Sequence, residues 1–310
     1  MVPMHATRMI RKMRGGSQPH LLECDNGNFY VVKFRNNPQH RRILINEWVA
    51  SVFLKYLQIS GPPAEIVDLS VEFLASNPDV YIQLGSQRRL AVEPGCHFGS
   101  RYPGDPCKVM VYDFLPDHLL DKVVNANEFA GAVAFDKWMG NADARQSIFF
   151  RARPGQGRSP SGRYAPRPGF VAYMMDHGFV FNGPHWTFPD SPLQGLYFRP
   201  QVYRNIRSLD DFQPWLDRVV RFPEAIVSEA HNQIPPEWLV GDEAALDVLL
   251  AKLMSRRRRV PDLIADSVGG RVNLFPDWSG PGAVYRPSQP LWPAPHSFLD
   301  PARDTTRGSF

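Results

Sequence analysis

The stretch Gly140–Phe150, "GNADARQSIFF", opens with polar residues and closes with an apolar run typical of a strand. Asn141 and Asp143 could form an ordinary turn, in which short polar side chains hydrogen-bond to the nearby backbone. They could equally form a catalytic loop, since functional side chains are often carried by loops at the ends of regular elements. This stretch alone fits both interpretations, so the choice depends on what the rest of the chain places beside it.

A second acid stands in a comparable position in "MMDHGFVFNG", Met174–Gly183. Asp176 follows the apolar run "FVAYMM" and lies two residues before Gly178. The end of a buried strand is an unfavourable place for a carboxylate unless a metal ion or a hydrogen-bond donor meets it. Asp176 is therefore the strongest single candidate for a functional residue.

The first 115 residues are predicted to form a small sheet with one helix. Residues 20–35 read as two strands around the turn signal Asp25-Asn26-Gly27, with Lys33 near the end of the second strand. Residues 42–57, "RILINEWVASVFLKYL", have apolar residues at helical spacing and carry Glu47. Further short strands are predicted at 64–70, 88–94 and 107–115.

The second half is predicted to be mainly helical. A helix over 127–140 has Asn127 or Asn125 as a possible N-cap and Gly140 as its stop. Strands at 147–152 and 170–181 flank a segment rich in Pro, Gly, Ser and Arg, which is predicted to be an exposed or partly disordered loop. Further helices are predicted at 209–222, 224–234 and 242–267, followed by an irregular Pro-rich tail, 269–310.

Composition excludes several classes of protein. The chain has 310 residues, 35 Lys and Arg, and 31 Asp and Glu, and the resulting charge of +4 is too small to indicate a nucleic-acid partner. Its three cysteines form no CxxC pair, and no apolar stretch reaches the ~18 residues of a membrane span. A reduced, cytoplasmic protein without membrane contact is expected. "RRRR", Arg256–Arg259, is interpreted as solvated cations at a helix end, not as a nucleic-acid contact.

Phosphoryl transfer requires a set of parts that this chain carries in order. It needs backbone donors near the phosphates, a lysine held by a carboxylate, an acid that orients the acceptor hydroxyl and an acid that holds Mg²⁺. A lysine near a strand end is more often a solvated edge charge, so Lys33 gains weight only from its pairing with a helix glutamate. The matching features are the glycine turn "RGGSQP" at Arg14–Pro19, Lys33, Glu47, Asp143 and Asp176.

The sequence resembles the HipA-like kinase family and, more distantly, HipA itself and the phosphatidylinositol kinases. The motifs that carry the resemblance span about residues 10 to 265 and are "GGSQPHLL", "YVVKF", "NEWVA", "HFGSRY", "FDKWMGNAD", "MMDHGFVFNG" and "GPHWTFPDSPLQGLY". Each motif is weak alone, and their shared order makes the match specific for the family. The resemblance does not identify the substrate.

The resemblance implies a bilobal, protein-kinase-like α+β fold that binds ATP and Mg²⁺. Residues 1–115 would form a small β-rich N-lobe with one helix, and residues 116–268 a larger, mainly helical C-lobe. Asp143 would be the catalytic acid, Asp176 the Mg²⁺ ligand, and Lys33 the phosphate contact fixed by Glu47. The implied nucleotide contacts are Gly15, Gly16 and Ser17 over the phosphates, and the backbone of Tyr112, Asp113 and Phe114 at the hinge.

The second metal ligand departs from the family pattern. HipA and the lipid kinases usually carry an asparagine five positions after the catalytic acid, where this chain has Ile148. Gln146 or Ser147 would have to replace it, and either can offer an oxygen to Mg²⁺. Gln146 is the favoured candidate.

The sequence therefore predicts a HipA-like kinase that transfers the γ-phosphate of ATP to a hydroxyl, on a Ser or Thr of an unidentified protein. One alternative is a nucleotide-binding pseudokinase that acts as a regulatory protein. A second is transfer of AMP instead of phosphate, and a third is a toxin-like regulator that binds DNA through a partner. The segment 185–199, "HWTFPDSPLQGLYFR", could bind substrate or could serve only in packing.

Overall fold

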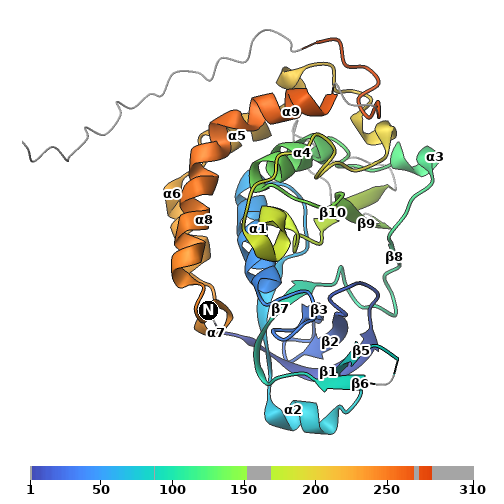
Figure 1. Ribbon diagram of the computed structural model, residues 1–310. Helices are drawn as coiled ribbons and strands as arrows, with labels where there is room; N and C mark the ends of the chain where they lie inside the picture. The colour runs from blue at the N-terminus through green and yellow to red at the C-terminus, as the bar shows by residue number, and fades with distance from the viewer. Residues whose placement is uncertain (1, 87, 152–168, 269–271, 281–310) are drawn as a thin grey trace, which may run out of the picture.

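The computed structural model describes residues 2–86, 88–151, 169–268 and 272–280. It has a β-rich N-terminal region, drawn at the bottom of Figure 1, and a helical C-terminal region, drawn above it. This confirms the mixed α/β class and the expected difference between the two regions. No helix in these ranges is both apolar enough and long enough to span a bilayer.

The N-terminal region is built on a closed five-stranded barrel with the order β1-β2-β3-β7-β4. The predicted hairpin at 20–35 is confirmed, because β2 and β3 pair antiparallel with Leu22 opposite Tyr30. β1 closes the barrel by pairing antiparallel with β2 and parallel with β4. A separate hairpin, β5-β6, lies beside it. The strands are β1 Met4–Lys12, β2 His20–Cys24, β3 Phe29–Lys33, β4 Ala64–Leu69, β5 Tyr81–Leu84, β6 Arg88–Ala91 and β7 Gly95–Arg101.

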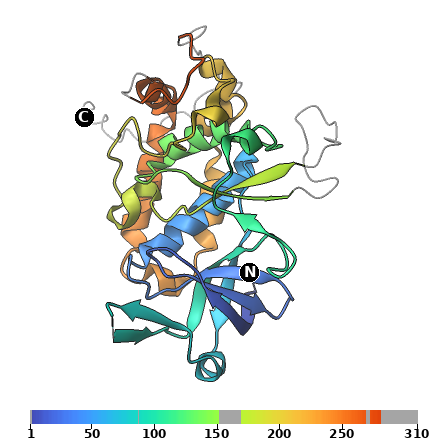
Figure 2. The same cartoon turned by 90° about the vertical axis from the view of Figure 1, so that its right-hand side faces the viewer.

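Helix α1, Arg42–Leu57, has the predicted bounds and lies between the barrel and the C-terminal helices (Figures 1 and 2). Most of its side chains are buried, since it is covered on several sides at once. The prediction of a single helix in this region is wrong. A second helix, α2 Val71–Ser76, begins at Ser70, whose hydroxyl accepts a hydrogen bond from the Phe73 N–H at 3.1 Å.

A three-stranded sheet, ordered β10-β9-β8, connects the two regions. β9 Gln146–Arg151 and β10 Phe170–Met175 pair antiparallel, as the strand-like runs predicted. β8 is only Val111–Tyr112, so the strand expected over 107–115 is much shorter than predicted. The segment predicted to be an exposed loop between β9 and β10 lies outside the described residues, except for Gly169 at its end.

Helix α4, Glu128–Met139, ends as predicted at Gly140, which adopts the left-handed conformation with φ 60°. Two other predicted helices are divided. Residues 209–222 form a 3-10 turn, Leu209–Phe212, and then α5, because Pro214 interrupts the helix. Residues 242–267 form α8, a 3-10 turn at Arg257–Arg259, and α9. The remaining helices are α3 Asp117–Leu120, α5 Trp215–Val220, α6 Glu224–Asn232, α7 Pro236–Leu239, α8 Glu243–Arg256 and α9 Val260–Val268.

Arg256, at the end of α8, is buried, so the expectation that the four arginines remain solvated is wrong for this one. Its guanidinium donates to Trp138 O at 2.8 Å and to Lys137 O at 2.9 Å, at the end of α4. It also pairs with Asp190 at 2.6 Å. Arg256 thus caps one helix from the end of another.

Residues 272–280 of the predicted tail pack on the helical region. Leu274 and Phe275 are buried, and the Phe275 ring lies 4.7 Å from the Tyr203 ring. The Ser279 N–H donates to Arg207 O at 2.9 Å. The rest of the tail lies outside the described residues.

Candidate active site

Lys33 lies between two carboxylates that come from different elements. Its ammonium group, at the end of β3, donates to Glu47 Oε1 on α1 and to Asp176 Oδ1, just after β10, at 2.7 Å. Lys33 and Glu47 are both buried. The structure therefore brings together three of the residues selected from the sequence, although the third lies 143 positions from the lysine.

Opposite charges keep Lys33 and Asp176 ionised. Burial alone would lower the pKa of Lys33, but the carboxylates of Glu47 and Asp176 raise it above its usual value. In turn, the charge of Lys33 lowers the pKa of Asp176. Lys33 is therefore an ammonium and Asp176 a carboxylate at neutral pH, as phosphate and metal binding require.

The backbone at Asp176 is strained, since its φ is 57°. Few residues other than glycine adopt this left-handed conformation, and such strain is concentrated at functional sites. Glycine is needed two residues later, at Gly178, because a Cβ there would lie 2.7 Å from Ile43 Cγ2 on α1. Only glycine allows the segment after Asp176 to lie this close to the helix that carries Glu47.

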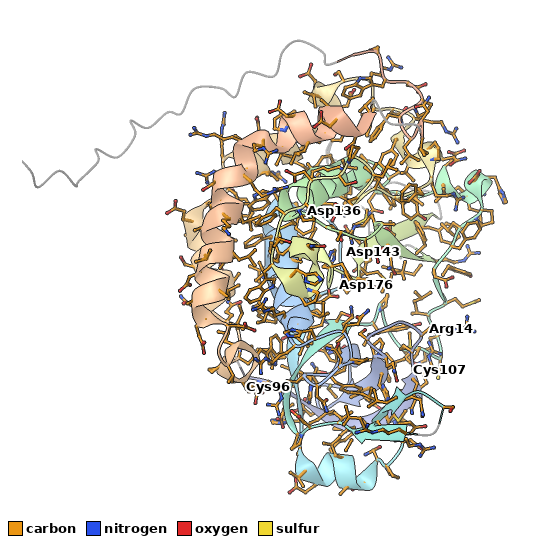
Figure 3. The ribbon with its side chains drawn as sticks, in the orientation of Figure 1. Arg14, Cys96, Cys107, Asp136, Asp143 and Asp176 are labelled. Atoms are coloured by element: carbon orange, nitrogen blue, oxygen red, sulfur yellow. The ribbon has the colours of Figure 1, made fainter. Side chains whose placement is uncertain are left out.

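These side chains line a cavity of about 780 Å³ between the two regions. The volume lies in the range of sites for small organic ligands. The lining includes all of the predicted phosphate loop, Gly15, Gly16 and Ser17, and both acids, Asp143 and Asp176. In Figure 3, Asp143 and Asp176 lie at the junction of the barrel with the helical region, and Asp136 lies further into the helices.

Asp143 is exposed in the loop between α4 and β9. Its Oδ1 accepts from the Ala144 N–H at 2.7 Å, and its N–H donates to the Asn141 side chain at 3.2 Å. The turn expected of short polar side chains therefore exists. The same turn directs Asp143 into the cavity, so the turn and the catalytic-loop interpretation are compatible.

A buried ion pair that the sequence analysis missed supports this loop. Arg145 binds both carboxylate oxygens of Asp136 on α4, one of them at 2.7 Å. It also donates to Met175 O at 2.7 Å and to His177 Nδ1 at 3.2 Å. Arg145 thus ties α4 and the Asp143 loop to the residues on either side of Asp176. The available signal was an acid, followed by a lysine, within the mainly apolar run "VAFDKWM".

His177 is held in a neutral form by the same pair. Burial, followed by the charge of Arg145, lowers its pKa well below the usual value. Its Nε2 donates to Met174 O at 3.2 Å. Both ring nitrogens are therefore engaged in hydrogen bonds.

Asn46, also missed, fixes the segment after Asp176 to α1. Its amide nitrogen lies 2.8, 3.1 and 3.0 Å from the carbonyl oxygens of Gly178, Val180 and Gly183. Its oxygen accepts from Trp186 Nε1 at 2.9 Å. The signal in the sequence was the polar Asn46, one position before Glu47 in a mainly apolar stretch with helical spacing.

The two candidates for the second metal ligand are oriented differently. Gln146 lines the cavity, and its amide nitrogen lies 3.5 Å from Asp143 Oδ2. Ser147 is buried outside the lining, and its hydroxyl donates to Met174 Sδ at 3.2 Å. Among the described residues no three His, Cys, Asp or Glu side chains form a metal cluster. Mg²⁺ is usually held by one or two carboxylates together with substrate phosphates, so the Asp176 carboxylate suits the ion, and the Gln146 amide oxygen as its second ligand stays a prediction.

The predicted hinge residues lie beside the cavity lining, not in it. Val111 lines the cavity, while Tyr112, Asp113 and Phe114 do not. Tyr112 packs against Phe170 at 6.0 Å, and the exposed Phe114 ring lies 4.5 Å from the Arg199 guanidinium. The hinge contacts of Tyr112, Asp113 and Phe114 with a nucleotide stay a prediction.

The segment 185–199 packs against the Asp143 loop. The Gly195 N–H donates to Asp143 O at 2.9 Å, and the Arg145 N–H donates to Leu196 O at 3.0 Å. Lys137 on α4 donates to three carbonyl oxygens of the segment, those of Ser191, Pro192 and Gln194. The packing interpretation of this segment is confirmed, and a role in substrate binding stays a prediction.

Residues 6–149 match the family model described as HipA-like kinase. Curated proteins give no match. One similar solved structure is a Golgi casein kinase with Mn/ADP bound, which is 12% identical with a TM-score of 0.45, and the match covers 87% of this chain and 73% of that one. Another is hydra Fam20 with sugar, which is 15% identical with a TM-score of 0.46, and the match covers 87% of each chain. At these values the two structures add no argument about this chain.

The family resemblance inferred from the motifs is confirmed over a shorter span than 10 to 265. The matched span includes the phosphate loop and ends within β9, before Asp176. Residues 6–149, which carry Lys33, Glu47 and Asp143, are similar to the HipA-like kinase family.

Proposed function

We propose that this protein is an ATP- and Mg²⁺-dependent kinase that transfers the γ-phosphate to the hydroxyl of a protein Ser or Thr. The observation that carries the proposal is the Lys33 ammonium bound to both Glu47 and Asp176, in one cavity with Asp143. Kinases need this arrangement of a lysine, its carboxylate partner and a metal-binding acid. The three free cysteines suit a reducing compartment, and we propose the cytoplasm.

Each residue has a distinct task in the proposed reaction. Lys33 contacts the α- and β-phosphates, and Glu47 holds its ammonium group in place. The backbone N–H groups of Gly15, Gly16 and Ser17 cover the phosphates, and Val111 lies next to adenine. Asp143 orients the acceptor hydroxyl and accepts its proton as the oxygen attacks the γ-phosphorus of ATP; the bond from that phosphorus to the β–γ bridging oxygen breaks, and ADP leaves.

Asp176 and Gln146 would hold Mg²⁺, which when bound neutralises the charge of the phosphates. Arg145 and Asn46 keep the loops that carry Asp143 and Asp176 at fixed positions relative to α1. Loops held in this way favour transfer, because the groups that act on the substrate need little rearrangement during the reaction.

The test is Mg²⁺-dependent incorporation of phosphate from γ-labelled ATP into the purified protein itself or into a lysate. We expect Asp143→Asn to abolish incorporation and to leave thermal stabilisation by Mg²⁺ and ATP intact. The absence of both ATP binding and Asp143-dependent incorporation would rule out the proposal. Labelling by α-labelled instead of γ-labelled ATP would indicate AMP transfer.

A pseudokinase is the second candidate, and one observation favours it. Ile148 lines the cavity at the position where HipA usually has its metal-binding asparagine. Thermal stabilisation by Mg²⁺ and ATP with no labelled product after long incubation would support this candidate.

A further inference from the structure

Two cations, Lys12 and Arg89, lie over one aromatic ring on the N-terminal region, and a third, Arg14, lies two residues after Lys12; we call these three residues the basic patch. Lys12 ends β1, Arg14 lies in the glycine loop, and Arg89 lies on β6; all three are exposed. Lys12 Nζ is 2.8 Å from the centre of the Tyr81 ring, and the Arg89 guanidinium is 4.1 Å from it. The ring thus brings cations from two hairpins together.

Within the described part of the chain, none of the three cations is paired with a carboxylate. Arg8, on the same strand as Lys12, does have such a partner, since it binds Glu23 at 2.7 Å. Lys12 and Arg89 lower the pKa of the Tyr81 hydroxyl, and the opposing effect of Asp79 on this pKa is smaller than that of either cation. The positive charge of the basic patch is therefore available to a partner.

The basic patch is continuous with the glycine loop that lines the candidate active site. Arg14 itself lines the cavity, next to Gly15 and Gly16, and Figure 3 shows it on the barrel side of the gap that separates it from Asp143. Gln18 fastens the glycine loop to β5, because its amide donates to Gln83 O and accepts from Gln83 N, both at 2.8 Å. A partner held by the patch would therefore lie at the entrance to the cavity.

We propose that the basic patch binds an acidic segment of the protein substrate and so directs its hydroxyl towards Asp143. This inference rests on the proposed kinase function and specifies its substrate class. Cations without partners at the rim of a site attract opposite charge and orient it on approach. A single-stranded nucleic acid would need open aromatic faces for its bases. Lys12 and Arg89 lie over the Tyr81 ring, so the ring is not open for stacking with a base.

The first test is binding without nucleotide. The probe is a fluorescein-labelled peptide with one Ser among Glu residues, and its control is the same peptide with Lys in place of Glu. We expect the acidic peptide to bind more tightly, with affinity falling as salt rises. The triple variant Lys12→Glu/Arg14→Glu/Arg89→Glu should weaken binding by at least about tenfold.

A control reverses charge at two exposed cations far along the chain, Lys252 and Arg258, and is compared with the double variant Lys12→Glu/Arg89→Glu, which changes the net charge by the same amount. Lys252→Glu/Arg258→Glu should change the affinity by less than about twofold. Equal losses in both variants would show that net charge alone attracts the peptide and would overturn the proposal. Tighter, patch-dependent binding of a labelled oligo-dT or of anionic lipid vesicles would overturn it in favour of those ligands.

The second test separates this inference from the proposed function. If the acidic peptide binds through the basic patch, while ATP does not bind and neither the peptide, the protein itself nor a lysate receives phosphate, the docking surface is supported and the kinase proposal fails. If the peptide is phosphorylated equally by the wild type and the triple variant, the kinase proposal stands and the surface fails. Thermal unfolding checks that the triple variant is folded, and Arg14→Glu alone provides a milder variant with the same expected direction.

Discussion

Lys33 shows how a single buried charge can organise residues from three elements. A buried ammonium is unfavourable unless carboxylates compensate it, and here two of them do. The same rule explains Asp136, whose buried carboxylate is matched by Arg145. At the residue scale, the polar groups within apolar surroundings are the ones that determine where the site lies.

Gln146 provides a test of the proposed metal site. Gln146→Ala should lower Mg²⁺-dependent phosphate transfer by about tenfold or more and raise the Mg²⁺ concentration needed, because an oxygen of the metal shell is lost. The matched control is Ser147→Ala, which should leave activity near that of the wild type, since this hydroxyl faces Met174. A Mg²⁺ titration of both variants gives the answer, and full activity of Gln146→Ala would exclude it as a ligand.

Arg145 provides a test of the supporting ion pair. Arg145→Met should lower the free energy of unfolding by about 3–5 kcal/mol, because the buried Asp136 carboxylate loses its partner. Arg258→Met, at an exposed position, should have little effect. Urea denaturation measures both. The double variant Asp136→Asn/Arg145→Met should recover part of the loss, and no recovery would contradict an origin in the unpaired charge.

At the scale of elements, α1 is held at its first turn by a C-terminal strap, which we define as residues 236–242. Asp242 binds Arg42 of α1 and approaches Arg41 at 3.9 Å. Glu237 binds Arg35, just after β3, at 2.7 Å. Cations at the start of a helix oppose its dipole, so the carboxylate of Asp242 relieves an unfavourable charge. The strap thus fixes the helix that carries Glu47.

Removing this carboxylate should loosen α1. We expect Asp242→Ala to lower the free energy of unfolding by about 1–2 kcal/mol and to speed amide exchange in the first turns of α1 about tenfold. Hydrogen–deuterium exchange read by mass spectrometry measures the change. Asp247→Ala, at an exposed acid on α8, is the control. Equal exchange in both variants would mean that the strap does not hold the helix.

Elements were predictable where local signals agreed with their surroundings. The bounds of α1 and the end of α4 at Gly140 followed from apolar spacing and glycine. The division of the predicted helix 209–222 at Pro214 was also present in the sequence and was missed. β7 could not be predicted in the same way, because "GCHFGSR" has little strand signal and is stabilised by β3 and β4 on either side.

At the scale of the whole molecule, buried neutral histidines make the fold sensitive to acid. His97 on β7 accepts from the Arg35 N–H and donates to Glu93 O, both at 2.9 Å. Burial lowers its pKa from 6.5 to about 3. Between these values the unfolded chain binds more protons than the folded one, so the free energy of unfolding rises with pH through this window.

His97→Gln removes this proton linkage. As the pH falls from 7 to 4, the wild type should lose about 3 kcal/mol of stability relative to the variant. Urea denaturation across this range measures the difference. His185→Gln, at an exposed histidine, should keep the wild-type dependence on pH. Parallel curves for the wild type and His97→Gln would contradict the prediction.

The sequence by itself determined the mixed class, the hairpin before Lys33, α1 with Glu47, and the two acids at strand edges, because local spacing and turn residues encode these features. Only the tertiary structure decided the closure of the barrel by β1, the orientation of Gln146 and Ser147, and the bonds of Asn46, Arg145 and the strap. Each of these depends on partners far away in sequence. The physical reason is that buried polar groups are satisfied by whatever the fold places beside them, and spacing along the chain does not record those neighbours.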